Sequence, residues 1–181
     1  MRTTVITTQE WGARPPKVQP KLTTPRYIVI HHTGVAPSSN GTLPGAEALA
    51  RSIQAYHMDH NGWIDSGQNF LISEAGFVLE GRTGSLAAIE MGRCVQSAHT
   101  VGANDSPGIE NEGNFMQADM PSAQWDALVK LCADICQLCH LPPSRIKGHR
   151  DFNSTKCPGA RLYRRLAQLK AEVSQLLKIS A

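Results

Sequence analysis

The sequence feature that most constrains the fold is a run of β-branched and aromatic residues, Arg26-Tyr27-Ile28-Val29-Ile30-His31-His32. A short apolar run of this kind, with Pro25 before it and a Gly-containing loop after it, is typical of a central strand that is buried on both faces. It predicts a layered domain built around a sheet.

Further strands and helices alternate along the chain. The first 25 residues are rich in Thr and Pro, which predicts an extended arm because proline disfavours helix at itself and just before it. Hydrophobic spacing predicts helices over 45–59, over 122–138 with Ser122 as the cap, and over 158–178. Strand signals lie at 69–73, 77–80, 108–115 and 145–149, the first two forming a hairpin.

These elements predict an α/β fold. We expect one domain of residues 1–181, with an extended arm (1–25) and a core (26–178). In the core, about three helices should flank a central mixed sheet.

Composition is that of a folded protein, with 41% of the 181 residues hydrophobic and 18% charged. The net charge of +3 is mildly basic and no block of Lys and Arg stands out, so we expect no nucleic-acid partner. No stretch reaches the roughly 18 consecutive apolar residues of a transmembrane segment. Five cysteines are an odd number, which excludes a fully paired disulfide framework and favours reduced thiols or a metal ligand.

Three residues could form a metal site. His31 ends the first strong strand, His149 ends the last, and Cys157 follows after a loop that can fold back toward His149. Two imidazoles and a thiolate with one open position are typical of a catalytic zinc site. Spacing alone leaves an alternative open, because seven histidines offer many chance pairs and a buried cysteine is an ordinary small hydrophobic residue.

Five motifs follow one another along the chain: Trp11-Gly12-Ala13-Arg14-Pro15-Pro16; Ile28-Val29-Ile30-His31-His32-Thr33; Gly67-Gln68-Asn69-Phe70-Leu71-Ile72 with the segment 76–82; Gly108-Ile109-Glu110-Asn111-Glu112-Gly113; and Gly148-His149-Arg150-Asp151 with Cys157-Pro158-Gly159. In this order they resemble the peptidoglycan recognition proteins and the type-2 N-acetylmuramoyl-L-alanine amidases, a family shared with amidase-type phage lysozymes. The resemblance extends from about Thr8 to about Leu166.

The resemblance implies a zinc-dependent hydrolase. Its substrate would be peptidoglycan, cleaved at the amide bond between the lactyl group of N-acetylmuramic acid and the L-alanine of the stem peptide. The cofactor would be Zn²⁺ at one edge of the sheet, with His31, His149 and Cys157 as ligands. His31 and His32 face opposite sides of a strand, so only one can reach the metal. Periodicity does not choose between them; the family pattern selects His31.

The resemblance also implies catalytic groups. Glu110 matches an acidic residue of bacterial members, where a carboxylate can take the proton of the attacking water and return it to the leaving amine. Glu112, two residues on, is the alternative. Thr155 matches a threonine of amidase-type animal members, whose hydroxyl could hydrogen-bond the scissile carbonyl oxygen as charge develops.

Three residues are expected beside the substrate. Gln68 stands where active relatives carry Tyr, and its amide can donate a hydrogen bond but cannot act as an acid. His99 lies in the segment Ser97-Ala98-His99, which resembles a segment that forms a wall of the family's substrate groove. His32 is expected to have a packing or supporting role there. We expect His57, within the first helix, to pack.

A second group of residues of the types that bind metals has the spacing C-x3-C-x2-C-H: Cys132, Cys136, Cys139 and His140. Cys132 and Cys139 continue the apolar stripe of the predicted helix. We therefore expect core residues here and no metal.

The alternative function is a non-catalytic peptidoglycan-binding module. Relatives of that kind lose the cysteine ligand, whereas Cys157 is present here. We expect a monomer. The first eight residues lack the apolar region of a secretory signal, so we expect synthesis in the cytoplasm and access to the wall through a holin or a dedicated secretion route. A phage endolysin, a recycling enzyme and an injected antimicrobial toxin all remain open.

Overall fold

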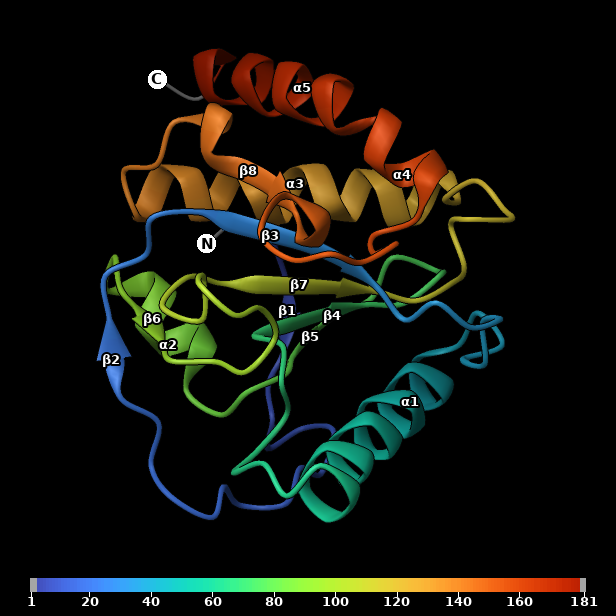
Figure 1. Cartoon of the computed structure of the whole chain (residues 1–181), viewed down its shortest axis with the longest axis vertical. Helices are drawn as coiled ribbons and strands as arrows, with labels where there is room; N and C mark the ends of the chain where they lie inside the picture. The colour runs from blue at the N-terminus through green and yellow to red at the C-terminus, as the bar shows by residue number, and fades with distance from the viewer. Residues whose placement is uncertain (1–2, 180–181) are drawn as a thin grey trace.

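The predicted central strand lies inside a six-stranded sheet in a computed structural model that describes residues 3–179 (Figure 1). Strand β3 (Ile28–His32) pairs in parallel with β7 (Gly108–Asn111) on one side and with β8 (Ile146–Gly148) on the other. Its run of Ile and Val is completely buried, as a strand with neighbours on both edges and layers on both faces requires.

The predicted mixed sheet is confirmed. The strand order is β1-β5-β4-β7-β3-β8. Strand β4 (Phe70–Ile72) runs parallel to β7 and antiparallel to β5 (Val78–Glu80), which confirms the predicted hairpin. Strand β1 (Val5–Ile6) adds in parallel to the outer edge of β5.

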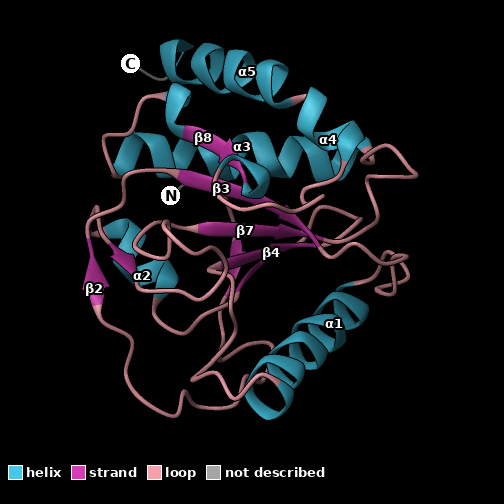
Figure 2. Ribbon diagram, viewed as in Figure 1, coloured by secondary structure: helices cyan, strands magenta, loops and turns pink. Residues whose placement is uncertain are grey.

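Helices cover the two faces of the sheet (Figure 2). Helices α3 (Ser122–Leu138) and α5 (Leu166–Ile179) pack against each other on one face and enclose the larger core. Helix α1 (Leu43–Ala55) covers the other face together with the buried Trp11. Side chains alternate along β3, so Ile30 belongs to the larger core and His31 points to the side of α1.

The arm predicted at residues 1–25 is partly built into the fold; its first two residues lie outside the described part of the chain. Beyond β1, the Trp11 indole N–H donates to the Glu80 carbonyl oxygen at 2.7 Å. Strand β2 (Leu22–Thr23) pairs with β6 (Cys94–Val95) in a second, two-stranded sheet, and α2 (Ser85–Glu90) lies beside it. None of these short elements was predicted, because two strand residues or six helical residues show no periodicity.

Several predicted boundaries were wrong. Thr42 caps α1 by accepting a hydrogen bond from the Gly45 amide at 3.2 Å, so the helix starts two residues early, and it passes into a π-helical turn, Tyr56–His60. Ser122 is the first residue of α3 and its side chain caps nothing; Pro121 holds the cap position. The strand predicted at 108–115 stops at Asn111.

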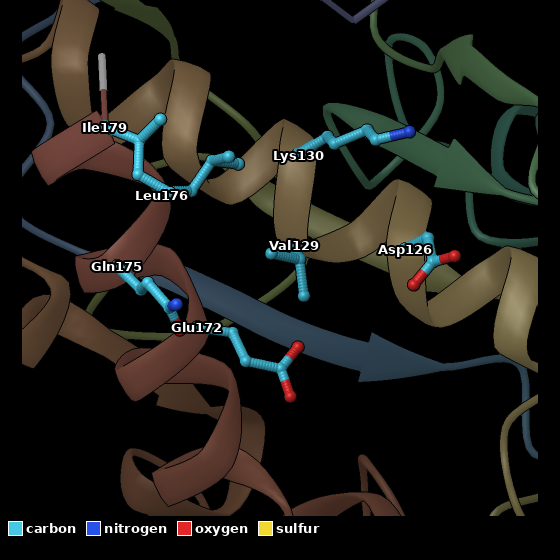
Figure 3. Close-up of a pocket in the computed structure, with 7 residues that line it drawn as sticks. All are labelled: Asp126, Val129, Lys130, Glu172, Gln175, Leu176 and Ile179. Carbon is cyan, nitrogen blue, oxygen red and sulfur yellow. The ribbon is translucent and has the colours of Figure 1, made fainter.

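The helix predicted at 158–178 is broken in two at Arg165, into α4 (Ala160–Arg164) and α5. The Arg165 guanidinium lies 3.6 Å above the centre of the Trp125 ring, a contact with α3 that apolar spacing does not reveal. Next to it, the α3–α5 pair carries a surface hollow with Val129, Leu176 and Ile179 among its lining residues (Figure 3). No helix among residues 3–179 is long and apolar enough to cross a membrane.

Candidate active site

The structure brings His31, His149 and Cys157 together. One ligand atom from each lies within 4.8 Å of the others, and within residues 3–179 this is the one group of three such side chains able to hold a metal ion. His31 comes from the end of β3, and His149 opens a short 3-10 turn, His149–Asp151, directly after β8. Because β3 and β8 are parallel neighbours, their carboxyl ends deliver both imidazoles to the same place.

The loop after His149 folds back so that Cys157 reaches the two imidazoles. The Arg150 amide donates to the Cys157 carbonyl oxygen at 3.1 Å, which closes the loop. The Cys157 Sγ accepts a hydrogen bond from the His32 amide at 3.4 Å, which fixes it at the end of β3.

The spacing of these atoms fits zinc. The His31 Nδ1 lies 3.6 Å from the Cys157 Sγ. Tetrahedral coordination with Zn–N of about 2.0 to 2.1 Å and Zn–S of about 2.3 Å requires an N–S separation of about 3.6 Å. Three protein ligands of this type also match the donor set of a catalytic site, which keeps one position free.

Burial controls the protonation of the three side chains. Burial, and then the neighbouring histidines, hold the pKa of His31 well below its ordinary value, and burial lowers the pKa of His149. Both imidazoles are therefore neutral at neutral pH, as a metal ligand must be. Burial and the nearby Glu110 raise the pKa of the Cys157 thiol to about 12, so an incoming cation must displace a proton from the sulfur.

Glu110 lies beside this cluster. It is paired with His31 across the β3–β7 ladder, so both side chains point to the α1 side of the sheet. Burial raises the pKa of Glu110 to about 7. A carboxyl group with that pKa can both accept and return a proton near neutral pH.

Glu110 lines two neighbouring cavities. One, of about 250 Å³, is lined by the three metal-type residues together with Gln68, His99 and Thr155. The other, of about 460 Å³, runs along α1, where Leu49, Ile53 and Tyr56 line it. Glu110 and His57 line both, so a long ligand could enter the groove beside α1 and extend to the cluster.

Glu112, the alternative to Glu110, is engaged elsewhere. Its carboxylate is buried and accepts hydrogen bonds from the Ser38 and Ser39 amides, the Ser39 hydroxyl and the Glu74 amide, at 2.6 to 2.9 Å. Burial alone would raise the pKa of Glu112, but these donors outweigh it and lower the pKa. The geometry therefore gives Glu112 a structural task, which is to tie the loop before α1 to the end of the sheet.

We expect Glu112→Gln to destabilise the protein by about 2 to 4 kcal/mol. The NH₂ group of glutamine would then face backbone N–H groups that now donate to a carboxylate oxygen. The pKa of Glu112 is lower in the folded than in the unfolded chain, so its stabilising effect is present above the ordinary value of 4.5 and is lost as the pH falls below it. Urea unfolding of wild type and variant at pH 7 and pH 3.5 measures this. An equal difference in unfolding free energy at both values would contradict the assignment.

Thr155 and Gln68 both line the smaller cavity. The Thr155 Oγ1 accepts a hydrogen bond from the Cys157 amide at 3.2 Å, which leaves its hydroxyl proton free to be donated. Gln68 is buried, and its Oε1 has no hydrogen-bond partner. A buried amide oxygen without a partner is costly, so this side chain is suited to a donor that a ligand supplies.

His32 and His57 are occupied by the protein itself, although both line the smaller cavity. The His32 Nδ1 accepts from the Phe115 amide at 3.2 Å and its ring stacks on the Phe115 ring. The His57 Nδ1 accepts from the Gly67 amide at 3.0 Å and its ring packs on Trp63. These contacts favour packing roles for both.

Three groups contact the histidines of the cluster, and of these the sequence singled out only His99, in a different role. The His149 Nε2 lies 3.1 Å from the Asn153 Oδ1. The His31 Nε2 lies 2.9 Å from the His99 Nδ1 and 3.2 Å from the Thr100 hydroxyl. The four-residue spacing of His149 and Asn153 was the only signal available, and it is a weak one.

The three cysteines of the second group belong to the core or pack against it, as predicted. Cys132 and Cys136 are buried in the larger core and Cys139 packs against it. Burial, and then the nearby Cys139 thiol, raise the pKa of Cys136 to about 12, and burial raises that of Cys139 to about 11. His140 is exposed at the end of α3. Among the described residues this group does not assemble a metal site.

Comparison with known proteins identifies relatives over most of the chain. The family model described as N-acetylmuramoyl-L-alanine amidase matches residues 21–160. Peptidoglycan recognition protein 1 of Bos taurus is 34% identical over 173 residues, 91% of this chain and 83% of the relative. Peptidoglycan-recognition protein SC2 of Drosophila melanogaster is 37% identical over 88% of this chain and 83% of the relative.

Solved structures agree with this fold. Drosophila PGRP-LB superimposes with a TM-score of 0.78 at 28% identity, over 91% of this chain and 92% of that chain. Peptidoglycan recognition protein-LE, solved in complex with tracheal cytotoxin (monomeric diaminopimelic acid-type peptidoglycan), gives a TM-score of 0.78 at 29% identity, over 91% and 92%.

These relatives overturn one expectation from the sequence. The predicted setting, with synthesis in the cytoplasm and release by a holin or a dedicated secretion route, followed the pattern of phage endolysins. The relatives found are animal peptidoglycan recognition proteins, from cattle and Drosophila, so that localisation was wrong. A short polar start was too weak a basis for it.

Proposed function

Because the chain belongs to the N-acetylmuramoyl-L-alanine amidase family, we propose that it is a zinc-dependent amidase. Its reaction is hydrolysis of the amide bond between the lactyl group of N-acetylmuramic acid and the L-alanine of a peptidoglycan stem peptide. One observation carries the proposal: His31 Nδ1 and Cys157 Sγ lie 3.6 Å apart with His149 beside them, at the spacing that zinc requires.

The zinc ion would be held by His31, His149 and Cys157. A zinc ion in such a site supplies Lewis-acid chemistry, polarising a carbonyl group and lowering the pKa of water. Glu110 takes a proton from the attacking water, whose oxygen adds to the amide carbonyl carbon. The same carboxyl group then gives the proton to the departing nitrogen as the C–N bond breaks. The products are the lactyl carboxylate and a peptide with a free amino terminus.

Two further side chains assist the developing charge. The Thr155 Oγ1 accepts a hydrogen bond from the Cys157 amide, which leaves its O–H group free to donate one. The O–H group can therefore donate a hydrogen bond to the substrate carbonyl oxygen as that oxygen becomes negative. The Gln68 amide lines the same cavity and can hydrogen-bond the substrate without exchanging a proton. Support for a muropeptide substrate comes from peptidoglycan recognition protein-LE, whose structure holds a monomeric peptidoglycan fragment. The groove beside α1 gives such a ligand room.

The proposal is tested by digesting purified peptidoglycan with the zinc-loaded protein. We expect released stem peptides with new amino termini on alanine, intact glycan strands, and loss of activity on treatment with a strong chelator, restored by zinc. New reducing ends on the sugars without new alanine amino termini would show a glycosidase. Cleavage that resists the chelator would exclude the zinc chemistry.

The second candidate is a peptidoglycan-binding module without catalysis. The observation in its favour is Gln68, an amide at a position where a proton donor is expected in active relatives. Such a module would sediment with insoluble peptidoglycan and release no peptide, even after loading with zinc. The digestion therefore separates the two functions directly.

A further inference from the structure

A chain of hydrogen bonds leads from a backbone carbonyl group to His31. The His99 Nε2 lies 2.9 Å from the Ser106 carbonyl oxygen, and the His99 Nδ1 lies 2.9 Å from the His31 Nε2. At the far side of the His31 ring, Nδ1 faces the Cys157 Sγ at 3.6 Å. Two imidazole rings thus connect a fixed backbone oxygen with the metal-type cluster.

The Ser106 carbonyl group determines which atom donates and which accepts in each of these hydrogen bonds. A carbonyl oxygen can only accept, so the His99 Nε2 carries a proton and donates it. A neutral imidazole has only one N–H group, so with Nε2 protonated the His99 Nδ1 can only accept. The His31 Nε2 then carries the proton that it donates to His99. The remaining nitrogen of His31, Nδ1, has a free lone pair directed to the cluster.

Thr100 does not alter this direction. Its hydroxyl lies 2.9 Å from the His99 Nδ1 and 3.2 Å from the His31 Nε2. A hydroxyl group can rotate to donate to one ring or accept from the other, so it adapts to the tautomer and does not select it.

We propose that His99 is a positioning residue for the metal site, which fixes the Nε2-protonated tautomer of His31 so that Nδ1 binds zinc. This inference rests on the proposed zinc chemistry. It replaces the expectation that His99 contacts substrate, because both ring nitrogens of His99 are taken by protein partners. A metal-binding histidine commonly donates its second N–H to such a partner, which fixes the ring and its tautomer.

The neighbouring strand leaves space for the His99 ring. A β-carbon added to Gly108, the first residue of β7, would lie 2.4 Å from two ring carbons of His99. Any side chain at this position would therefore move the ring. The absence of a side chain at Gly108 lets the imidazole lie against the strand between Ser106 and His31.

The experiment measures zinc affinity of the metal-free full chain by competition with a chromophoric chelator, without substrate. His99→Leu removes the acceptor and should weaken zinc binding roughly 10- to 100-fold. His99→Asn keeps an acceptor oxygen where Nδ1 was and should restore most of that affinity. His60→Leu, the same substitution at an exposed histidine outside both cavities, should leave the affinity unchanged.

Nitrogen NMR of the zinc-loaded wild type tests the tautomer without any variant. We expect the His31 Nδ1 shifted by the metal and the His31 Nε2 bonded to a slowly exchanging proton. Zinc on the His31 Nε2 would overturn the inference. Equal losses in the Leu and Asn variants would also overturn it, since they would indicate packing and not an acceptor.

The outcomes distinguish this inference from the proposed function. A wild-type chain that binds no zinc would end both. A wild type and a His99→Leu variant that bind zinc equally tightly would end this inference alone and leave the amidase proposal intact.

Discussion

Replacing Cys157 with serine should remove zinc from the purified protein and abolish hydrolysis. The serine hydroxyl does not ionise near neutral pH, so the site would keep two neutral imidazoles and lose its only anionic ligand. We expect the zinc dissociation constant to rise by more than about 100-fold, the upper range for loss of a supporting contact around a metal. Metal content after dialysis, measured by elemental analysis, should fall from about one ion per chain to near zero.

The other cysteines provide matched controls for Cys157→Ser. Cys136→Ser and Cys139→Ser should keep zinc content unchanged. Cys132→Ser should also keep zinc, although a hydroxyl at this fully buried position should cost about 1 to 3 kcal/mol of stability. Loss of zinc from one of these three variants, with Cys157→Ser still loaded, would mean that a different cysteine binds the metal.

Glu110→Gln should lower kcat by about 10² to 10⁴, the usual contribution of a general acid–base group, with zinc content and unfolding free energy nearly unchanged. Glutamine keeps the size of the side chain and one carbonyl oxygen but cannot take a proton at neutral pH. Steady-state release of stem peptide measures the effect. Glu90→Gln, which changes an exposed carboxylate, is the matched control and should have no effect.

The pH profile adds a second test of Glu110. The ionised carboxylate is the form that accepts a proton, so kcat should rise with pH through the pKa of about 7. The Gln variant should lack this rise. A loss smaller than tenfold, or an unchanged profile, would assign proton transfer to another group and leave the zinc site unaffected.

Much of the fold could be predicted because its main elements have long or strong patterns. A run of β-branched residues indicates strand β3. Apolar residues at helical spacing indicate α3, and this spacing ends before Pro142-Pro143. Strands β1, β2 and β6 could not be found, since each has two residues and owes its extended form to a partner distant in the sequence.

The sequence was enough to select the side chains that the structure brings together at the candidate site. It was not enough to identify the backbone groups that hold those side chains in place. His31 and His149 lie at the carboxyl ends of two parallel neighbouring strands, and Cys157 lies in the loop that folds back after His149. Glu110 and Glu112 look equivalent in the sequence, and only the folded loop shows that backbone amides of Ser38, Ser39 and Glu74 surround the second. The Ser106 carbonyl group that orients His99 is likewise invisible, because every residue has one.

The placement of β3 between β7 and β8 has a consequence for how the chain is made. On a ribosome β3 emerges early, while both strands that pair with it emerge after α1 and the β4–β5 hairpin. Until then its Ile-Val-Ile run has two open edges, and contacts between distant segments form slowly, so the nascent chain is exposed to aggregation. The same order also delays assembly of the candidate site. A partly made chain holds His31 without His149 and Cys157, so it cannot assemble the metal-type cluster until nearly all of it has been synthesised.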